Sequence, residues 1–132
     1  MEVVNATPSD LDKAFARLTE RRVEALLVGA EATYGGHIQL LISLAARHKM
    51  PTMYWRREFA EAGGLASYGT SVVDAYRQAG VYVARILKGE KAGELPVVQT
   101  AKFEFVLNLK TARALGIDVP MAFSAAADEI IE

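Results

Sequence analysis

The segment ALLVGAEATYGGHIQLLISLAARHKMPTMYW, residues 25–55, decides the predicted fold. It begins and ends with short apolar runs, residues 25–28 and 52–55, whose length is typical of strands covered on both faces. Between the two runs, apolar side chains recur every three or four positions and predict a helix that ends before Pro51. Because a strand, a helix and a second strand in this order form the unit of a parallel sheet, the segment predicts an α/β fold.

The same alternation continues through the rest of the chain. We expect further strands near residues 2–5, 65–68 and 103–108, and one or two helical turns in the tail, residues 121–132. The longest helix is expected over residues 71–88. Its apolar positions recur at helical spacing and predict its buried face: Val72, Ala75, Tyr76, Ala79, Val83, Ile86 and Leu87. The predicted fold class is therefore α/β, an open, largely parallel sheet flanked by helices.

The composition excludes several classes of protein. The chain has 132 residues, of which 52% are hydrophobic and 23% charged, and these values are typical of one globular domain. A formal net charge of -1 leaves no basic surface for nucleic acid, so we expect no such partner. Cysteine is absent, which excludes disulfides, thiolate metal sites and a cysteine nucleophile. No run is long and apolar enough to predict a membrane span, and the first residues do not predict a signal peptide.

No motif in the chain predicts catalysis or metal binding. Gly29 and Gly35 bracket a loop before a helix, but neither the spacing of a phosphate-binding loop nor that of a dinucleotide fingerprint is present. His37 and His48 are eleven positions apart and cannot share one face of a helix as metal ligands. The serines lack the surroundings of a nucleophile elbow. We therefore expect no catalytic residue, no metal ligand and no cofactor, and we do not expect an enzyme.

Three aromatic residues predict a binding surface. Tyr34, Trp55 and Tyr68 each lie at or just after the carboxyl end of a predicted strand, where open parallel sheets bind their ligands. Together they would form a stacking surface for a flat ligand. Beside Trp55, the charged residues Arg56, Arg57 and Glu58 could bind an anionic or zwitterionic group. The alternative for Trp55, that it completes the core beneath the loop, is equally consistent with the sequence.

Residues 54–69 carry a more specific pattern, R-E-F-x-x-x-G-G-L-x-S-Y-G, which begins at Arg57 and ends at Gly69. This pattern resembles the substrate-binding proteins of bacterial ABC transporters related to the uptake of tryptophan and other aromatic amino acids. Further similarities follow in residues 76–89, 95–116 and 127–131, so the resemblance covers essentially the whole chain.

The resemblance implies a type I periplasmic binding protein, in which two flavodoxin-like α/β lobes are joined by a hinge and the ligand binds between them. Members of the family are considerably longer than this chain. By comparison, residues 1–89 would form most of the carboxyl-terminal lobe, without its first strand and helix, and residues 90–132 would form the hinge-crossing and closing segment. The absent strand would lie between the expected strands at residues 2–5 and 25–28, and an unpaired sheet edge of this kind predicts a homo-oligomer.

The resemblance also implies a function and a set of ligand-binding residues. The protein would capture a small solute, such as an aromatic or other amino acid, in an interlobe cleft and deliver it to the membrane permease of an ABC transporter. It would be periplasmic or lipoprotein-anchored. Asp74 would face an ammonium group, although a first-turn acid also suits the helix dipole. The residues expected to contact the ligand are Thr33, Tyr34, Trp55, Arg56, Ser67, Tyr68 and Asp74.

A second reading remains open at this point. Bacterial transcriptional regulators use the same two-lobed fold to bind an effector, and the chain could be such an effector-binding domain. No helix-turn-helix is visible in the sequence to favour it.

Overall fold

The computed structural model describes residues 3–98 and 102–132, and they fall into two compact units. The first unit combines Met1–Gly69 with Glu104–Glu132, and the second is Thr70–Phe103. Each unit is described by itself below.

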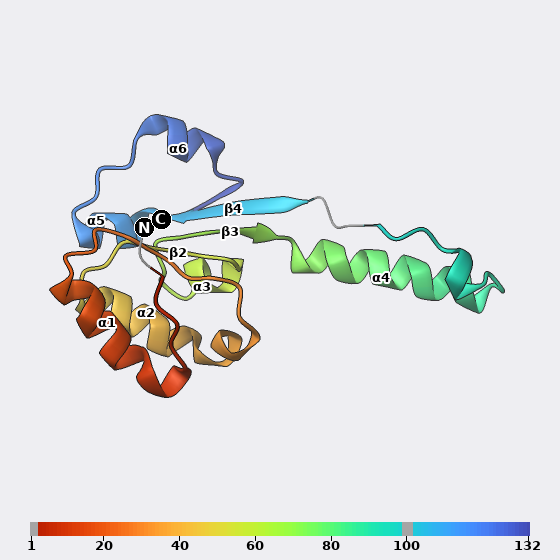
Figure 1. Ribbon diagram of the computed structural model, residues 1–132. Coiled ribbons are helices and arrows are strands. Elements are labelled where there is room, and N and C mark those ends of the chain that lie inside the picture. The colour runs from red at the N-terminus through yellow and green to blue at the C-terminus, as the bar shows by residue number, and fades with distance from the viewer. Residues whose placement is uncertain (1–2, 99–101) are drawn as a thin grey trace. The chain divides into compact units, whose positions relative to one another are not determined.

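A five-stranded sheet organises the fold (Figure 1), in the order β1-β2-β3-β4-β5. The strands are β1 (Leu26–Leu27), β2 (Thr52–Tyr54), β3 (Ala66–Thr70), β4 (Phe103–Asn108) and β5 (Glu129–Ile131). The pairs β1–β2, β2–β3 and β4–β5 are parallel. The amide of Asn108, at the end of β4, donates to the carbonyl of Leu65, just before β3, and the amide of Ser71, just after β3, donates to Lys102, just before β4. Strand β4 therefore runs antiparallel to β3, and the sheet is largely parallel, as expected.

Helices cover both faces of the sheet in the first unit. Figure 1 shows α1 and α2 on one side of the strands and α6 on the other. The helical elements of this unit are η1 (Pro8–Asp10), α1 (Leu11–Glu20), η2 (Ala32–His37), α2 (Ile38–Arg47), α3 (Arg57–Glu61), α5 (Leu109–Leu115) and α6 (Met121–Ala126). The largest side chains of the core come from α1, α2, β2 and α3: Phe15, Leu41, Leu44, Tyr54 and Phe59.

The predicted strand at residues 2–5 is wrong for the residues that the structure describes. Residues 3–5 form no strand, and residue 2 lies outside the described residues. The side chains of Val4 and Ala6 pack against the core instead, and the carbonyl of Ala6 accepts a hydrogen bond from the hydroxyl of Tyr34. The segment is therefore held by side-chain packing and one hydrogen bond rather than by pairing with a strand of the sheet.

The tail contains a strand that the sequence did not predict. Met121–Ala126 forms the expected helical turns, but Glu129–Ile131 then forms β5. Strand β4 offers an edge along Val106–Asn108, and β5 pairs with it in parallel register, with Val106 opposite Glu129. This long-range pairing outweighs the local helical preference of the tail.

The second unit, Thr70–Phe103, contains α4 (Val72–Leu87) and η3 (Ala92–Glu94). Ser71 caps α4 by accepting a hydrogen bond from the amide of Asp74, and Gly89 follows its end with a φ of 101°. The long helix is confirmed, but its predicted buried face is wrong, because no residue of α4 is buried and Tyr76 is 76% exposed. Within the described part of this unit, η3 is the one other helical element, and it is too short to cover that face.

Candidate functional site

The carboxyl ends of β1 and β2 bring together two of the predicted aromatic residues. Tyr34 lies in η2, which follows β1, and Trp55 directly follows β2. Their ring centroids are 6.4 Å apart, with the planes tilted by 52°. Because β1 and β2 are parallel neighbours, the segments that follow them meet at one edge of the sheet, as the sequence predicted.

The core supports Trp55 from below. Its ring centroid lies 4.7 Å from that of Phe59, which is fully buried and stacks on Tyr54 with a centroid separation of 4.6 Å. Trp55 itself remains partly exposed. The packing of Trp55 against the core is therefore confirmed, and its partial exposure leaves the stacking surface a prediction.

Local hydrogen bonds hold the loop before α2. The hydroxyl of Tyr34 donates to the carbonyl of Ala6, so the outer end of this ring is fixed. Thr33 is exposed, and its amide and hydroxyl donate to the carboxylate of Glu31 over 3.4 Å and 3.5 Å. Thr33 and Tyr34 thus lie on one short turn beside Trp55, with Thr33 toward solvent.

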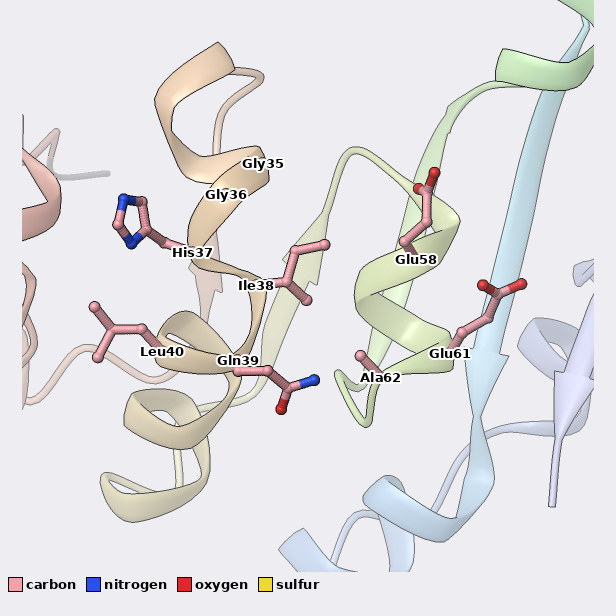
Figure 2. A pocket seen from close by; sticks show the side chains of 9 residues that line it. All are labelled: Gly35, Gly36, His37, Ile38, Gln39, Leu40, Glu58, Glu61 and Ala62. Carbon is pink, nitrogen blue, oxygen red and sulfur yellow. The ribbon is translucent and has the colours of Figure 1, made fainter.

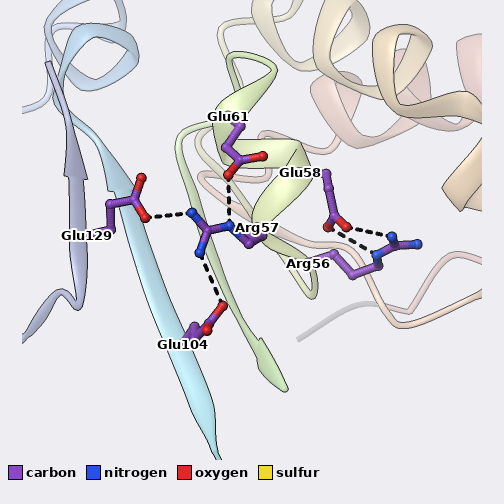
Figure 3. Close-up of polar contacts among 6 residues, drawn as sticks. All are labelled: Arg56, Arg57, Glu58, Glu61, Glu104 and Glu129. Atoms are coloured by element: carbon purple, nitrogen blue, oxygen red, sulfur yellow. Dashed lines mark hydrogen bonds and ion pairs between the residues drawn. The ribbon is translucent and has the colours of Figure 1, made fainter. Parts of the chain in front are cut away.

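Arg56 forms a two-bond ion pair with Glu58 (Figure 3). Its Nε and Nη2 donate to the two carboxylate oxygens over 3.1 Å and 2.7 Å. The guanidinium of Arg56 holds the pKa of Glu58 below its ordinary value. Two of the three charged residues that the sequence analysis named beside Trp55 are therefore paired with each other, and the site presents one group of each sign.

The remaining predicted ligand residues lie in different surroundings. Ser67 and Tyr68 are inside β3 rather than after it. The hydroxyl of Ser67 is buried and has no hydrogen-bond partner among the described residues, whereas Tyr68 is 54% exposed. Asp74 belongs to the second unit, on the first turn of α4. The structure thus brings Thr33, Tyr34, Trp55 and Arg56 into one region of the first unit.

A pocket of about 580 Å³ opens between the start of α2 and α3. In Figure 2, Ile38 and Gln39 point toward α3, while His37 and Leu40 point away from it. The lining residues are Gly35, Gly36, His37, Ile38, Gln39, Leu40, Glu58, Glu61 and Ala62. Glu58 both lines this pocket and accepts the hydrogen bonds of Arg56. The volume is within the range of small-molecule sites.

The sequence analysis named Arg57 only as a charged residue beside Trp55 and missed its ion pairs with other parts of the chain. Its guanidinium contacts the carboxylates of Glu61, Glu104 and Glu129 (Figure 3) at 2.8, 3.4 and 2.6 Å. The hydrogen bonds that the guanidinium donates to Glu61 and Glu129 raise the pKa of Arg57. The spacing of four positions to Glu61 is a visible helical signal. The contacts to Glu104 and Glu129 depend on the pairing of β4 with β5, which the sequence did not predict.

Comparison with known families supplies the identity of this arrangement. A family model described as ABC transporter substrate binding protein matches residues 2–131. The chain belongs to the ABC transporter substrate-binding protein family. This family comprises solute-binding proteins and not enzymes, and the comparisons do not support a transcriptional regulator.

Solved structures of similar proteins agree with this family. A conserved domain protein from Vibrio cholerae O1 has a TM-score of 0.84 and 27% sequence identity over 98% of this chain and 44% of its own. An ABC domain in complex with L-Trp from Streptococcus pneumoniae has a TM-score of 0.84 and 26% identity over 95% of this chain and 42% of its own. A ligand-free, open substrate-binding protein with adhesive properties from Clostridium difficile, at 19% identity and a TM-score of 0.66, shares the fold, with 99% of this chain and 43% of its own covered.

The chain spans less than half the length of these solved relatives. Curated protein sequences contain no match to it. Across the described residues, the helices are too short or too polar to cross a membrane.

Proposed function

We propose that this substrate-binding domain captures a small zwitterionic solute, of the aromatic or another amino acid class, at the carboxyl ends of β1 and β2. The observation that carries the proposal is the convergence of Tyr34 and Trp55, whose ring centroids lie 6.4 Å apart at this edge. The similar Streptococcus pneumoniae structure, which holds L-Trp, supports an amino acid as the ligand.

The chemistry of the proposed site matches both parts of such a solute. The partly exposed ring of Trp55 offers an aromatic face for stacking, which adds contact area at little cost in side-chain entropy. A zwitterion carries a carboxylate and an ammonium group, and the Arg56–Glu58 pair offers one group of each opposite sign. Thr33, Ser67, Tyr68 and Asp74 stay predicted contacts from the family resemblance.

The proposed role of the whole protein is import. In it, the solute would be enclosed between two lobes and delivered to the membrane permease of an ABC transporter, and the protein would be periplasmic or lipoprotein-anchored. Residues 1–89 and 90–132 are still predicted to be lobe and closing segment, respectively. The first unit supplies one wall of such a site, and a one-sided site buries much less ligand than a closed pocket. We therefore expect this chain alone to bind with roughly millimolar affinity.

Calorimetric titration at high ligand concentration tests the proposal. L-Tryptophan, L-phenylalanine, L-alanine and L-lysine are titrated into the chain and into two variants. Tyr34→Ala removes one ring of the site, and Tyr76→Ala removes a 76% exposed tyrosine of α4 as the matched control. We expect the aromatic amino acids to bind more tightly than L-alanine, and only Tyr34→Ala to weaken them. Equal heats for all four amino acids, or equal effects of the two substitutions, would contradict the proposal.

A further inference from the structure

The cluster around Arg57 joins three elements through one side chain (Figure 3). Arg57 is the first residue of α3, Glu104 lies near the start of β4, and Glu129 begins β5. The guanidinium spreads its donors over Glu61 on its own helix and over both strands. The planar guanidinium of arginine can donate to three separate carboxylates at once. A lysine ammonium group is a single compact charge and cannot reach all three from one position.

The cluster contains more acid than base. Three carboxylates surround one guanidinium, and Glu104 is the least exposed of them, with 19% of its side chain accessible. Without Arg57, these carboxylates would lie near one another with no cation between them, and Glu104 would lose a partner in a partly buried position. Loss of the guanidinium therefore does more than remove three contacts, because it leaves like charges that repel.

Helix α3 depends on such anchors for its position. It has five residues, which is too short for a helix to be stable without tertiary contacts. At its carboxyl end, the side-chain amide Nδ2 of Asn108 donates to the carbonyl of Ala60 over 3.0 Å, and the hydroxyl of Thr111 donates to the carbonyl of Gly63 over 2.9 Å. At its amino end, Arg57 ties it to β4 and β5.

The anchored end of α3 leads directly into the candidate site. Arg57 follows Arg56 and Trp55 in the chain, and Phe59 of the same helix supports the Trp55 ring. In addition, Glu104 is the first residue of the first unit after the chain returns from the second, and Gly69 is the last before it leaves. Glu104 contacts Arg57, and Gly69 lies against the carbonyl of Trp55. Trp55 therefore contacts the residue at which this part of the first unit ends, and Arg57 contacts the residue at which the first unit resumes.

We propose that Arg57 is a positioning residue of the solute site, which fixes Trp55 through the amino end of α3 and its ion pairs with β4 and β5. Its consequence for solute affinity rests on the proposed function. Its effect on the position of Trp55 does not, and the two can be measured apart.

Trp55 is the single tryptophan of the chain, so its fluorescence reports on this site without any ligand. Acrylamide quenching is measured for the unaltered chain, for Arg57→Gln and for Arg57→Lys. The matched control is Arg85→Gln, which removes a two-donor ion pair with Glu90 in the second unit. Circular dichroism establishes that each variant is folded before quenching is compared.

We expect Arg57→Gln to raise the quenching constant of Trp55 about twofold, as a ring held at the surface of the core gains freedom. Arg57→Lys should give an intermediate value, since the charge is kept and the fork is lost. Arg85→Gln should leave it unchanged. Calorimetry with L-tryptophan should then show roughly tenfold weaker binding for Arg57→Gln.

Unchanged quenching in folded Arg57→Gln would overturn the proposal, and so would equal changes in Arg57→Gln and Arg85→Gln. If Arg57→Gln does not fold, Arg57→Lys is judged by the same criterion. Failure of the unaltered chain to bind L-tryptophan would contradict the proposed function and leave the quenching result as the test of Arg57.

Discussion

The α-carbon of Gly69 lies directly against the main-chain carbonyl group of Trp55. A β-carbon at position 69 would overlap the Trp55 oxygen and lie 2.8 Å from its carbonyl carbon. Strand β3 can therefore approach the segment after β2 this closely only because residue 69 has no side chain. The peptide that carries the partly exposed Trp55 is therefore fixed by a backbone contact as well as by the packing of its ring.

Gly69→Ala should consequently destabilise the first unit. The added methyl group forces the β3 backbone away from Trp55, and overpacking of this kind costs about 1–3 kcal/mol of unfolding free energy. Urea unfolding followed by Trp55 fluorescence measures the loss. The control is Gly29→Ala, where a β-carbon would meet no atom within 4 Å. Equal stabilities of the two variants would show that the close approach is not a constraint.

Phe59→Ala should be among the most damaging single changes. Phe59 is fully buried, stacks on Tyr54 and supports Trp55, so its removal leaves a cavity beneath the candidate site. We expect a loss of about 3–5 kcal/mol in unfolding free energy. Phe123→Ala, at a 57% exposed position of α6, provides the comparison and should cost much less. A loss below that of Phe123→Ala would contradict the assigned core.

Tyr54 should make stability fall in alkaline solution. Burial raises its pKa from 10.0 to about 12, and Thr52 acts in the opposite direction. The folded value lies above the unfolded one, so the contribution to stability is fully present below pH 10 and is lost as the pH rises toward 12. The loss is of the order of 2–3 kcal/mol. Urea midpoints of the unaltered chain and of Tyr54→Phe, measured across this range, should diverge. If the urea midpoints of the two proteins fell equally with pH, ionisation of Tyr54 would not be the cause of the loss.

The exposed edge of the sheet predicts self-association. Strand β1 ends the sheet order, and Leu27 on it is 71% exposed. An apolar side chain on an unpaired strand edge favours pairing with a second copy, and a charge there opposes it. Light scattering should therefore show a larger mass for the unaltered chain than for Leu27→Lys. Met121→Lys, at an 86% exposed position of α6, should retain the larger mass. A monomeric unaltered chain would refute the prediction.

Local patterns in the sequence predicted much of the fold. The apolar run over residues 52–55 and the periodic positions of 71–88 correspond to β2 and α4, because each follows from neighbouring residues alone. Strand β5 follows from pairing with β4, which lies more than twenty positions away, and the exposure of α4 follows from the lack of an element to cover it in the described part of its unit. Neither the pairing of β5 nor the exposure of α4 can be predicted from neighbouring residues in the sequence.

The candidate site was predictable to a similar extent. The rule that ligands bind beyond the carboxyl ends of parallel strands led to Tyr34 and Trp55, and the structure brings these rings together. The burial of Ser67 inside β3 and the engagement of Arg56 by Glu58 depend on side-chain packing. The contact of Arg57 with Glu129 joins residues 72 positions apart and cannot be read from spacing.

The most direct test of amino acid binding at this edge uses the indole N–H resonance of Trp55. Because the chain has one tryptophan, its ¹H–¹⁵N spectrum contains one such signal, and L-tryptophan and L-alanine are titrated to about 10 mM, where a millimolar site is largely occupied. We expect this signal and the amide signals of Thr33 and Tyr34 to shift in a saturable manner with L-tryptophan and much less with L-alanine. An unmoved Trp55 signal, or shifts confined to other parts of the chain, would contradict it.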